Sequence, residues 1–176
     1  MLILLGLSAF TQIIYEGDNM NINKAFVTNI SKLTTQHKNE HKNYEYYKKI
    51  VLSGDNGDKC NVSVYEIPPK KSAYPYHYHL LNQETFYIIS GVGTLRTPVG
   101  EMNITAGDIL VFPPSEAGAH KITNSSDTEM LIYIDFSTYN STEVSFMPDS
   151  NKTVIYGKDV KRIAINGMEA DYYDGE

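Results

Sequence analysis

Residues 76–84 are Tyr-His-Tyr-His-Leu-Leu-Asn-Gln-Glu, two histidines one residue apart followed by a carboxylate. Side chains on a β-strand alternate between its faces, so His77 and His79 would project from one face about 6.7 Å apart along the chain. Two imidazoles placed in this way can converge on one metal ion, and Glu84 can join them after a short turn. The spacing alone leaves a second interpretation open, in which both histidines are half-exposed polar residues of an edge strand.

Short runs of β-type residues extend in both directions from this stretch. We expect strands near residues 46–52, 61–67, 76–80, 84–90, 93–97, 101–105, 108–112, 120–124 and 129–136. Turn-forming residues, such as those at 91–93 and 124–127, separate most of these runs. Many short strands with regular turn signals and no long helix predict an all-β sandwich or barrel.

Two motifs in this region resemble those of the cupin family. The first is His77-Tyr78-His79, four residues, Glu84, six residues and Gly91; the second is Gly107, five residues, Pro113, then Gly118-Ala119-His120 and, after three residues, Asn124. The sequence departs from the second motif in the segment 113–118, which is longer than usual and extends the loop before the third histidine. The resemblance covers roughly residues 60–137, and the two motifs together are far more specific than either alone.

The cupin resemblance implies a double-stranded β-helix (jelly-roll) barrel that holds one divalent metal ion, with Fe, Mn, Ni or Zn as the candidates. Its ligands, carried over position by position, would be His77, His79, Glu84 and His120. Four protein ligands leave one or two positions open on a five- or six-coordinate ion, where water, dioxygen or a chelating substrate can enter.

The chain divides into three segments. We expect an N-terminal arm at 1–43, the cupin barrel at 44–140 and a C-terminal extension at 141–176, in which the runs 144–147 and 153–156 add edge strands. Residues 20–43 are polar with little periodicity, which favours an arm or a short helix over a part of the core. Residues 1–19 belong to the arm only if Met1 is the native start, and we hypothesise that Met20 is the native start instead.

Composition excludes several kinds of partner. The formal charge is −6 and no basic cluster exceeds a lysine pair, so a nucleic-acid partner is not expected. The apolar run Met1–Ile14 is shorter than the roughly 20 residues that span a bilayer, and no cation precedes it as in a signal peptide. Cys60 is the one cysteine, which excludes an internal disulfide and suits a reducing compartment, so we expect a cytoplasmic protein.

Two other patterns carry weaker hypotheses. The stretch His37-Lys38-Asn39-Glu40-His41 fits the motif of inverted zinc proteases, which requires a helix docked beside a cleft. The residues around this stretch are polar and offer no apolar face for docking, which favours a solvated arm. The tyrosines at 74, 76 and 78 alternate with the two histidines, so we expect them on the outer face, where they would support a homodimer. With Ile122 on the side of His120, the mouth of the barrel is expected to be largely apolar.

Together these features predict a metal-binding cupin that acts on, or binds, a small polar or carbonyl-bearing metabolite. An enzyme of this kind would carry out oxygenase chemistry with iron, or isomerase or lyase chemistry with the ion as a Lewis acid. The alternative is a non-catalytic, metal-dependent module that binds a small sugar-like ligand. The sequence offers no evident acid or base beyond the four ligands, which weighs against catalysis.

Overall fold

Antiparallel strands make up nearly all the regular structure of this computed structural model, which describes residues 25–165. The largest sheet has the order β1-β2-β3-β10-β5-β8, with β1 Thr35–His41, β2 Tyr44–Leu52, β3 Cys60–Ile67, β10 Leu131–Thr138, β5 Glu84–Ser90 and β8 Ile109–Phe112. A second sheet, β7-β6-β9, contains β7 Gly100–Thr105, β6 Val92–Thr97 and β9 Lys121–Asn124. The third, β13-β12-β11-β4, contains β13 Val160–Ile165, β12 Lys152–Gly157, β11 Glu143–Met147 and β4 Tyr78–His79.

Helix is confined, within residues 25–165, to four single 3-10 turns: Ile30–Lys32, Gly54–Asn56, Glu116–Gly118 and Pro148–Ser150. None of the helices in this range is long and apolar enough to cross a membrane. The all-β class and the jelly-roll barrel are therefore confirmed, and so is the strand character of the runs 144–147 and 153–156.

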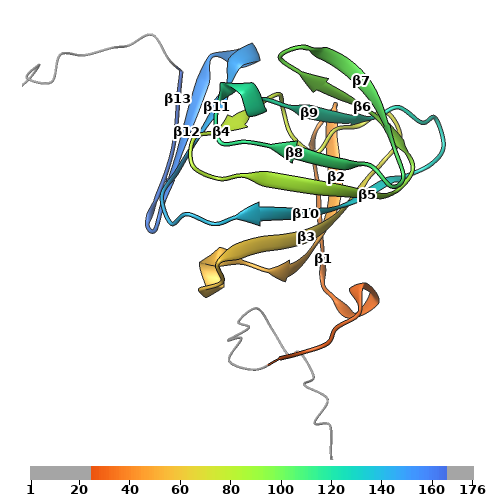
Figure 1. The fold of residues 1–176 in the computed structure, drawn as a ribbon, viewed down its shortest axis with the longest axis horizontal. Coiled ribbons are helices and arrows are strands. Elements are labelled where there is room, and N and C mark those ends of the chain that lie inside the picture. Colours follow the sequence, from red (N-terminus) through yellow and green to blue (C-terminus); the bar gives the residue numbers. More distant parts are fainter. Residues whose placement is uncertain (1–24, 166–176) are drawn as a thin grey trace, which may run out of the picture.

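The third sheet closes one end of the barrel (Figure 1). Strand β10 lies between β3 and β5, although it follows both of them in the sequence. This order wraps the chain around a common core. Strand β11 then pairs with β4, so that Ser145 is opposite His79 and Phe146 is opposite Tyr78. The C-terminal extension is thus brought directly onto the histidine stretch that precedes the barrel's central strands.

Inward-facing side chains of β5 and β10 form the centre of the core. Ile88 and Leu131 are fully buried, and the rings of Phe86 and Tyr133 stack with their centroids 5.0 Å apart. Burial of an aliphatic side chain of this size stabilises the fold by about 1.5–3 kcal/mol. Tyr87, the residue between two buried neighbours on β5, faces outward and is exposed, as alternation along a strand requires.

Strand β1 corrects part of the predicted N-terminal arm. Residues Thr35–His41 pair with β2 at the edge of the six-stranded sheet, and the ring of His37 stacks on Tyr47 with centroids 4.2 Å apart. Most side chains of β1 are exposed, so this strand has no apolar face and its sequence shows no alternation. The segment 1–19, with its apolar run Met1–Ile14 and the hypothesis of a start at Met20, lies outside the described residues.

Candidate metal centre

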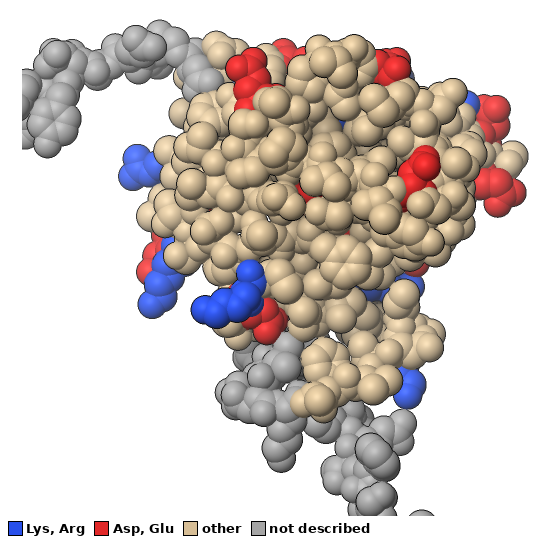
Figure 2. Space-filling view, in the orientation of Figure 1, with Lys and Arg blue, Asp and Glu red and all other residues tan. Residues whose placement is uncertain are grey.

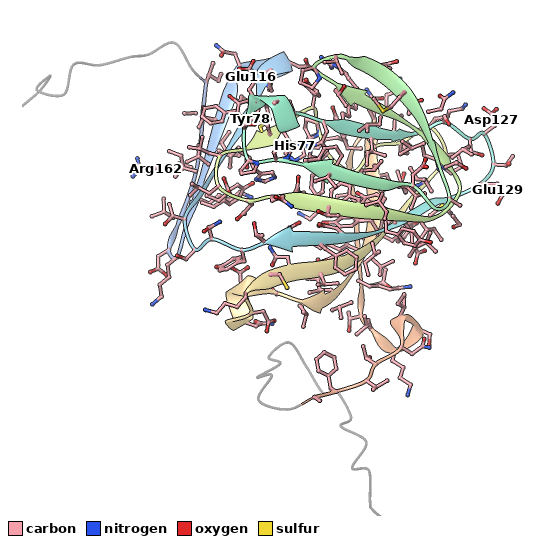
Figure 3. The ribbon with its side chains drawn as sticks, in the orientation of Figure 1. His77, Tyr78, Glu116, Asp127, Glu129 and Arg162 are labelled. Atoms are coloured by element: carbon pink, nitrogen blue, oxygen red, sulfur yellow. The ribbon has the colours of Figure 1, made fainter. Side chains whose placement is uncertain are left out.

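The backbone joins the two histidine motifs. The N–H of His77 donates to the carbonyl of His120 at 3.1 Å, and the N–H of His120 donates back to the carbonyl of His77 at 2.9 Å. His79 follows in β4, and Glu84 begins β5 after the loop 80–83. His77 lies within the barrel at the end that β4 and β11 occupy (Figure 3).

The four predicted ligands lie together in space. One nitrogen from each of His77 and His79 and one oxygen of Glu84 lie within 4.8 Å of one another, so this group could hold a metal ion. His120 joins the group through Glu84, because its Nε2 lies 3.3 Å from Glu84 Oε2, while His79 Nε2 lies 3.5 Å from the same oxygen. The extended segment 113–118 forms a 3-10 turn and leaves His120 beside His77.

The Nδ1 atom of each histidine is engaged outside the group. His77 Nδ1 lies 2.9 Å from the carbonyl of Pro75, and His120 Nδ1 lies 2.9 Å from the carbonyl of Gly118. A carbonyl only accepts, so these Nδ1 atoms carry the proton and both Nε2 atoms keep a free lone pair. Metal-bound histidines in proteins are held in the same way, with the second ring nitrogen donating to an oxygen.

Electrostatics at the centre favour a bound cation. Glu84 Oε2 is buried and accepts no hydrogen bond, although two imidazole nitrogens face it. Burial raises the pKa of Glu84 to about 8 and lowers the pKa values of His77 and His79 to about 4, so protonated imidazoles are disfavoured. Three neutral imidazoles and one carboxyl group, which a bound cation would hold as the carboxylate, form a donor set that suits Zn, Fe, Ni or Mn.

A cavity of about 1310 Å³ opens beside this group. His77, His79, Glu84 and His120 line part of it, and Lys48 and Asp135 line it as well. Charged side chains thus lie among the apolar ones that line this cavity, where apolar surroundings were expected. The inward positions of β10 alternate as Leu131, Tyr133, Asp135 and Ser137, so the strand places a carboxylate among its buried residues.

Asp135 and Lys48 are charged groups that sequence reasoning missed. Asp135 is only 7% exposed, and burial raises the pKa of its carboxyl to about 6, while the hydroxyl of Ser137 donates to Oδ1 and opposes that rise. Burial lowers the pKa of Lys48, whose Nζ lies 5.1 Å from the centroid of Tyr65. The sequence did contain a signal for Asp135, because it is an acidic residue at an inward-facing position of a strand whose inward face was expected to be apolar.

The tyrosines before the histidines divide between the two faces. Tyr74 lines the cavity, with its hydroxyl 3.1 Å from that of Tyr65 and 3.2 Å from that of Tyr46, so an outer-face position is wrong for this residue. Tyr76 packs under the Arg96 guanidinium, 4.0 Å from the ring centroid, and Tyr78 stacks on Phe146. The reason is that strand β4 begins only at Tyr78, so regular alternation does not extend back to Tyr74.

The other two candidates contribute nothing to this centre. His37 and His41 lie in β1, a strand rather than the helix that an inverted zinc protease requires. Cys60 begins β3 and is partly buried, with its thiol free.

Comparison with known proteins agrees with this architecture. A family model for the cupin domain matches residues 63–136. A candidate sugar phosphate isomerase from Acidithiobacillus ferrooxidans superposes with a TM-score of 0.71 and 25% identity, covering 81% of this chain and 91% of that one. No curated protein matches the chain.

Two further solved structures show the fold alone. A sugar phosphate isomerase of the cupin superfamily from Silicibacter pomeroyi superposes with a TM-score of 0.70 and 17% identity, covering 83% of this chain and 96% of that one. A predicted oxalate decarboxylase from Thermotoga maritima gives a TM-score of 0.57 and 23% identity, covering 65% of this chain and 100% of that one. The strand order, the two histidine motifs and the family match agree on a cupin double-stranded β-helix fold, and the match to the cupin domain covers residues 63–136.

Proposed function

We propose that His77, His79, Glu84 and His120 bind one divalent metal ion and that the protein is a metal-dependent isomerase of a small, sugar-like carbonyl compound. The observation that carries this proposal is a buried carboxyl group without an ion-pair partner, Asp135, in the same cavity as the ligand group. Among the described residues no cationic group lies within 4.0 Å of Asp135, so no ion pair accounts for its burial. Groups of this kind in a cavity are candidates for proton transfer.

The ion would serve as a Lewis acid that polarises the carbonyl oxygen of the substrate. Asp135, as a carboxylate, would take the proton from the carbon beside the carbonyl and return it to the carbonyl carbon. The proton of the hydroxyl on that neighbouring carbon would pass to the carbonyl oxygen, so that the hydroxyl becomes the new carbonyl. An aldose and a ketose interconvert in this way with no oxidant, no leaving group and no net uptake of protons. A carboxyl with a pKa of about 6 is suited to both halves of such a transfer near neutral pH.

Sugar-like substrates are favoured by the polar wall of the cavity and by likeness to the Acidithiobacillus protein, a candidate sugar phosphate isomerase. Asn61, Asn82 and Ser141 line this cavity with groups that can bond to hydroxyls. Lys121, Lys158 and Lys161 also line it, and in the described range none of the three forms an ion pair within 4.0 Å. Their charges would suit a phosphorylated substrate.

The test combines metal analysis with a search for turnover. Protein purified without a metal-affinity column is analysed for bound metal, loaded with that metal, and incubated in D₂O with aldose and ketose phosphates and their unphosphorylated forms. We expect deuterium at the carbon beside the carbonyl together with the isomeric product. A variant with His77, His79 and His120 all changed to Ala serves as the metal-free control.

Other outcomes separate the rival functions. Thermal stabilisation by a sugar with neither isomer nor deuterium formed would favour the non-catalytic binding module. Bound iron, with oxygen uptake in place of isomerisation, would favour an oxygenase. Either result overturns the isomerase proposal.

We also propose a homodimer formed through the outer face of β5, β8 and β10. Exposed apolar side chains gather there, namely Tyr87, Ile89, Ile109, Val111 and Phe136. Charged side chains lie mostly around the edge of this face (Figure 2), so two copies can meet without opposing like charges. Light scattering should give twice the monomer mass, and Ile109→Lys with Val111→Lys should give the monomer. The cytoplasmic location remains a prediction.

A further inference from the structure

The carboxylate of Glu143 receives four backbone hydrogen bonds. Its Oε1 accepts from the N–H groups of Leu80 at 3.0 Å, Leu81 at 3.1 Å and Val144 at 2.8 Å, and its Oε2 accepts from Asn82 at 2.6 Å. The residue is only 4% exposed. A buried carboxylate holding several N–H groups acts as a strong and specific clamp.

The clamped segment connects two of the metal-ligand candidates. Leu80, Leu81 and Asn82 lie in the loop between His79 at the end of β4 and Glu84 at the start of β5. The N–H of Leu80 also donates to the carbonyl of Val144 at 2.9 Å. Because the loop is held at three consecutive amides, its conformation sets how far apart His79 and Glu84 lie.

Strand β11 also reaches the ring of His79. Ser145, which is 2% exposed and opposite His79 in the β11–β4 pairing, places its Oγ 3.2 Å from His79 Nδ1. Glu143 Oε2 lies 4.0 Å from the same nitrogen. For His77 and His120 the corresponding Nδ1 partner is a backbone carbonyl close in sequence, whereas for His79 it comes from a separate strand.

We propose that β11 is a positioning element for the metal centre, in which Glu143 sets the loop between His79 and Glu84 and Ser145 orients the His79 ring. This inference rests on the proposed metal site. In this role each acts through His79 or the loop at 80–82, although both residues also line the cavity. Both lie outside residues 63–136, the part of the chain that the cupin model matches, so the extension would position ligands that all lie within the family domain.

Replacement of Glu143 by Gln tests the clamp with little change in volume. The amide keeps one acceptor but turns an N–H₂ group toward the N–H of Leu80, Leu81 or Asn82. We expect affinity for Co(II) to fall by about 10- to 100-fold, as on loss of a group that orients a ligand. The visible spectrum of the Co(II) protein should change as well, and hydrogen exchange at residues 80–82 should accelerate.

Two controls separate positioning from loss of stability. Ile104→Ala removes a buried side chain from β7, a strand that does not pair with β11, and it should lower the melting temperature while leaving Co(II) affinity and spectrum as in the unchanged protein. Glu129→Gln makes the same chemical change at an exposed site in the loop at the far edge of the molecule (Figure 3), and it should alter nothing.

Ser145→Ala keeps the inference testable if Glu143→Gln does not fold. Loss of one hydroxyl should leave the strand intact, reduce Co(II) affinity and shift the spectrum. The positioning role is overturned if both variants keep the Co(II) affinity and spectrum of the unchanged protein. If Glu143→Gln is unfolded, the same result for Ser145→Ala alone overturns it. Failure of the unchanged protein to bind Co(II) would instead overturn the proposed metal site itself.

Discussion

His120 Nε2 lies 3.3 Å from Glu84 Oε2, and that buried oxygen accepts no hydrogen bond. Because His120 Nδ1 contacts the carbonyl of Gly118, Nε2 presents a lone pair to a carboxylate oxygen. Two acceptors held so close together are unfavourable unless a proton or a metal cation lies between them, and a metal cation would replace the proton that burial holds on Glu84. This relationship is the electrostatic argument for a cation at the centre.

Removal of a single ligand should release the metal. We expect His79→Ala to lose most of the bound ion, as measured by elemental analysis of protein prepared without added metal. Binding at a free metal concentration 100 times Kd stabilises a fold by about 2.7 kcal/mol, so the variant should also lose the metal-dependent rise in melting temperature.

His37→Ala is the matched control, because His37 lies in β1 and pairs with Glu45 away from the cavity. It should retain the metal content of the unchanged protein. Stoichiometric metal in a variant with His77, His79 and His120 all changed to Ala would show that the ion binds elsewhere.

The stability of the metal-free protein should fall as the pH rises from 7 to 8. Burial raises the pKa of Glu84 from 4.5 to about 8, so in this window the folded carboxyl holds a proton that the unfolded one has lost. Burial lowers the pKa values of His77, His79 and His120 in the fold, so the unfolded imidazoles, with an ordinary pKa of 6.5, hold more protons near pH 7 and offset part of this slope. A full proton corresponds to about 1.4 kcal/mol per pH unit, so the net fall between pH 7 and 8 should be less than about 1 kcal/mol.

Glu84→Gln should remove most of that pH dependence, because an amide does not titrate. Urea unfolding of EDTA-treated protein at several pH values measures the slope directly. An unchanged slope in the variant would assign the effect to another group. Added metal should reverse the trend in the unchanged protein, since it binds the carboxylate and not the acid.

Much of the barrel was predictable because its strands alternate in hydrophobicity. Strands β5 and β10 lie within a few residues of their expected bounds, since Ile88 and Leu131 mark a regular inward face. Strand β1 was missed because both of its faces are polar. The ligand candidates were found because the spacing of His77 and His79 is local to the chain.

The surroundings of the centre were not predictable, because they depend on pairings between distant segments. Glu143 contacts Leu80 across 63 positions of sequence, and no local pattern indicates that β11 pairs with β4. Asp135 was within the expected strand, but only the closed barrel shows that its face borders the cavity. Sequence reasoning therefore located the candidate ligands and missed the groups that would orient them and transfer protons.

Asp135→Asn should abolish turnover while leaving the metal in place. General acid–base groups typically contribute about 100- to 10,000-fold to rate, and an amide cannot take up the substrate proton. Deuterium incorporation from D₂O into a sugar substrate should fall by at least about 100-fold, with metal content unchanged. Asp127→Asn, at an exposed loop position, is the control and should keep full activity. Full activity in Asp135→Asn would remove this residue from the mechanism.

Gly118→Ala should damage both the fold and the metal site. A Cβ at this position would lie 2.0 Å from the carbonyl oxygen of Pro113, so the loop before His120 must shift. Forced packing of this kind costs about 1–3 kcal/mol. The carbonyl of Gly118 contacts His120 Nδ1, so the shift should also turn the imidazole and weaken metal binding. Gly157→Ala is the control, because its Cβ would lie 3.7 Å from the nearest atom, Val160 Cβ. Calorimetric titration with Co(II) measures the metal affinity of both variants. Equal affinity in Gly118→Ala and Gly157→Ala would mean that the loop does not orient His120.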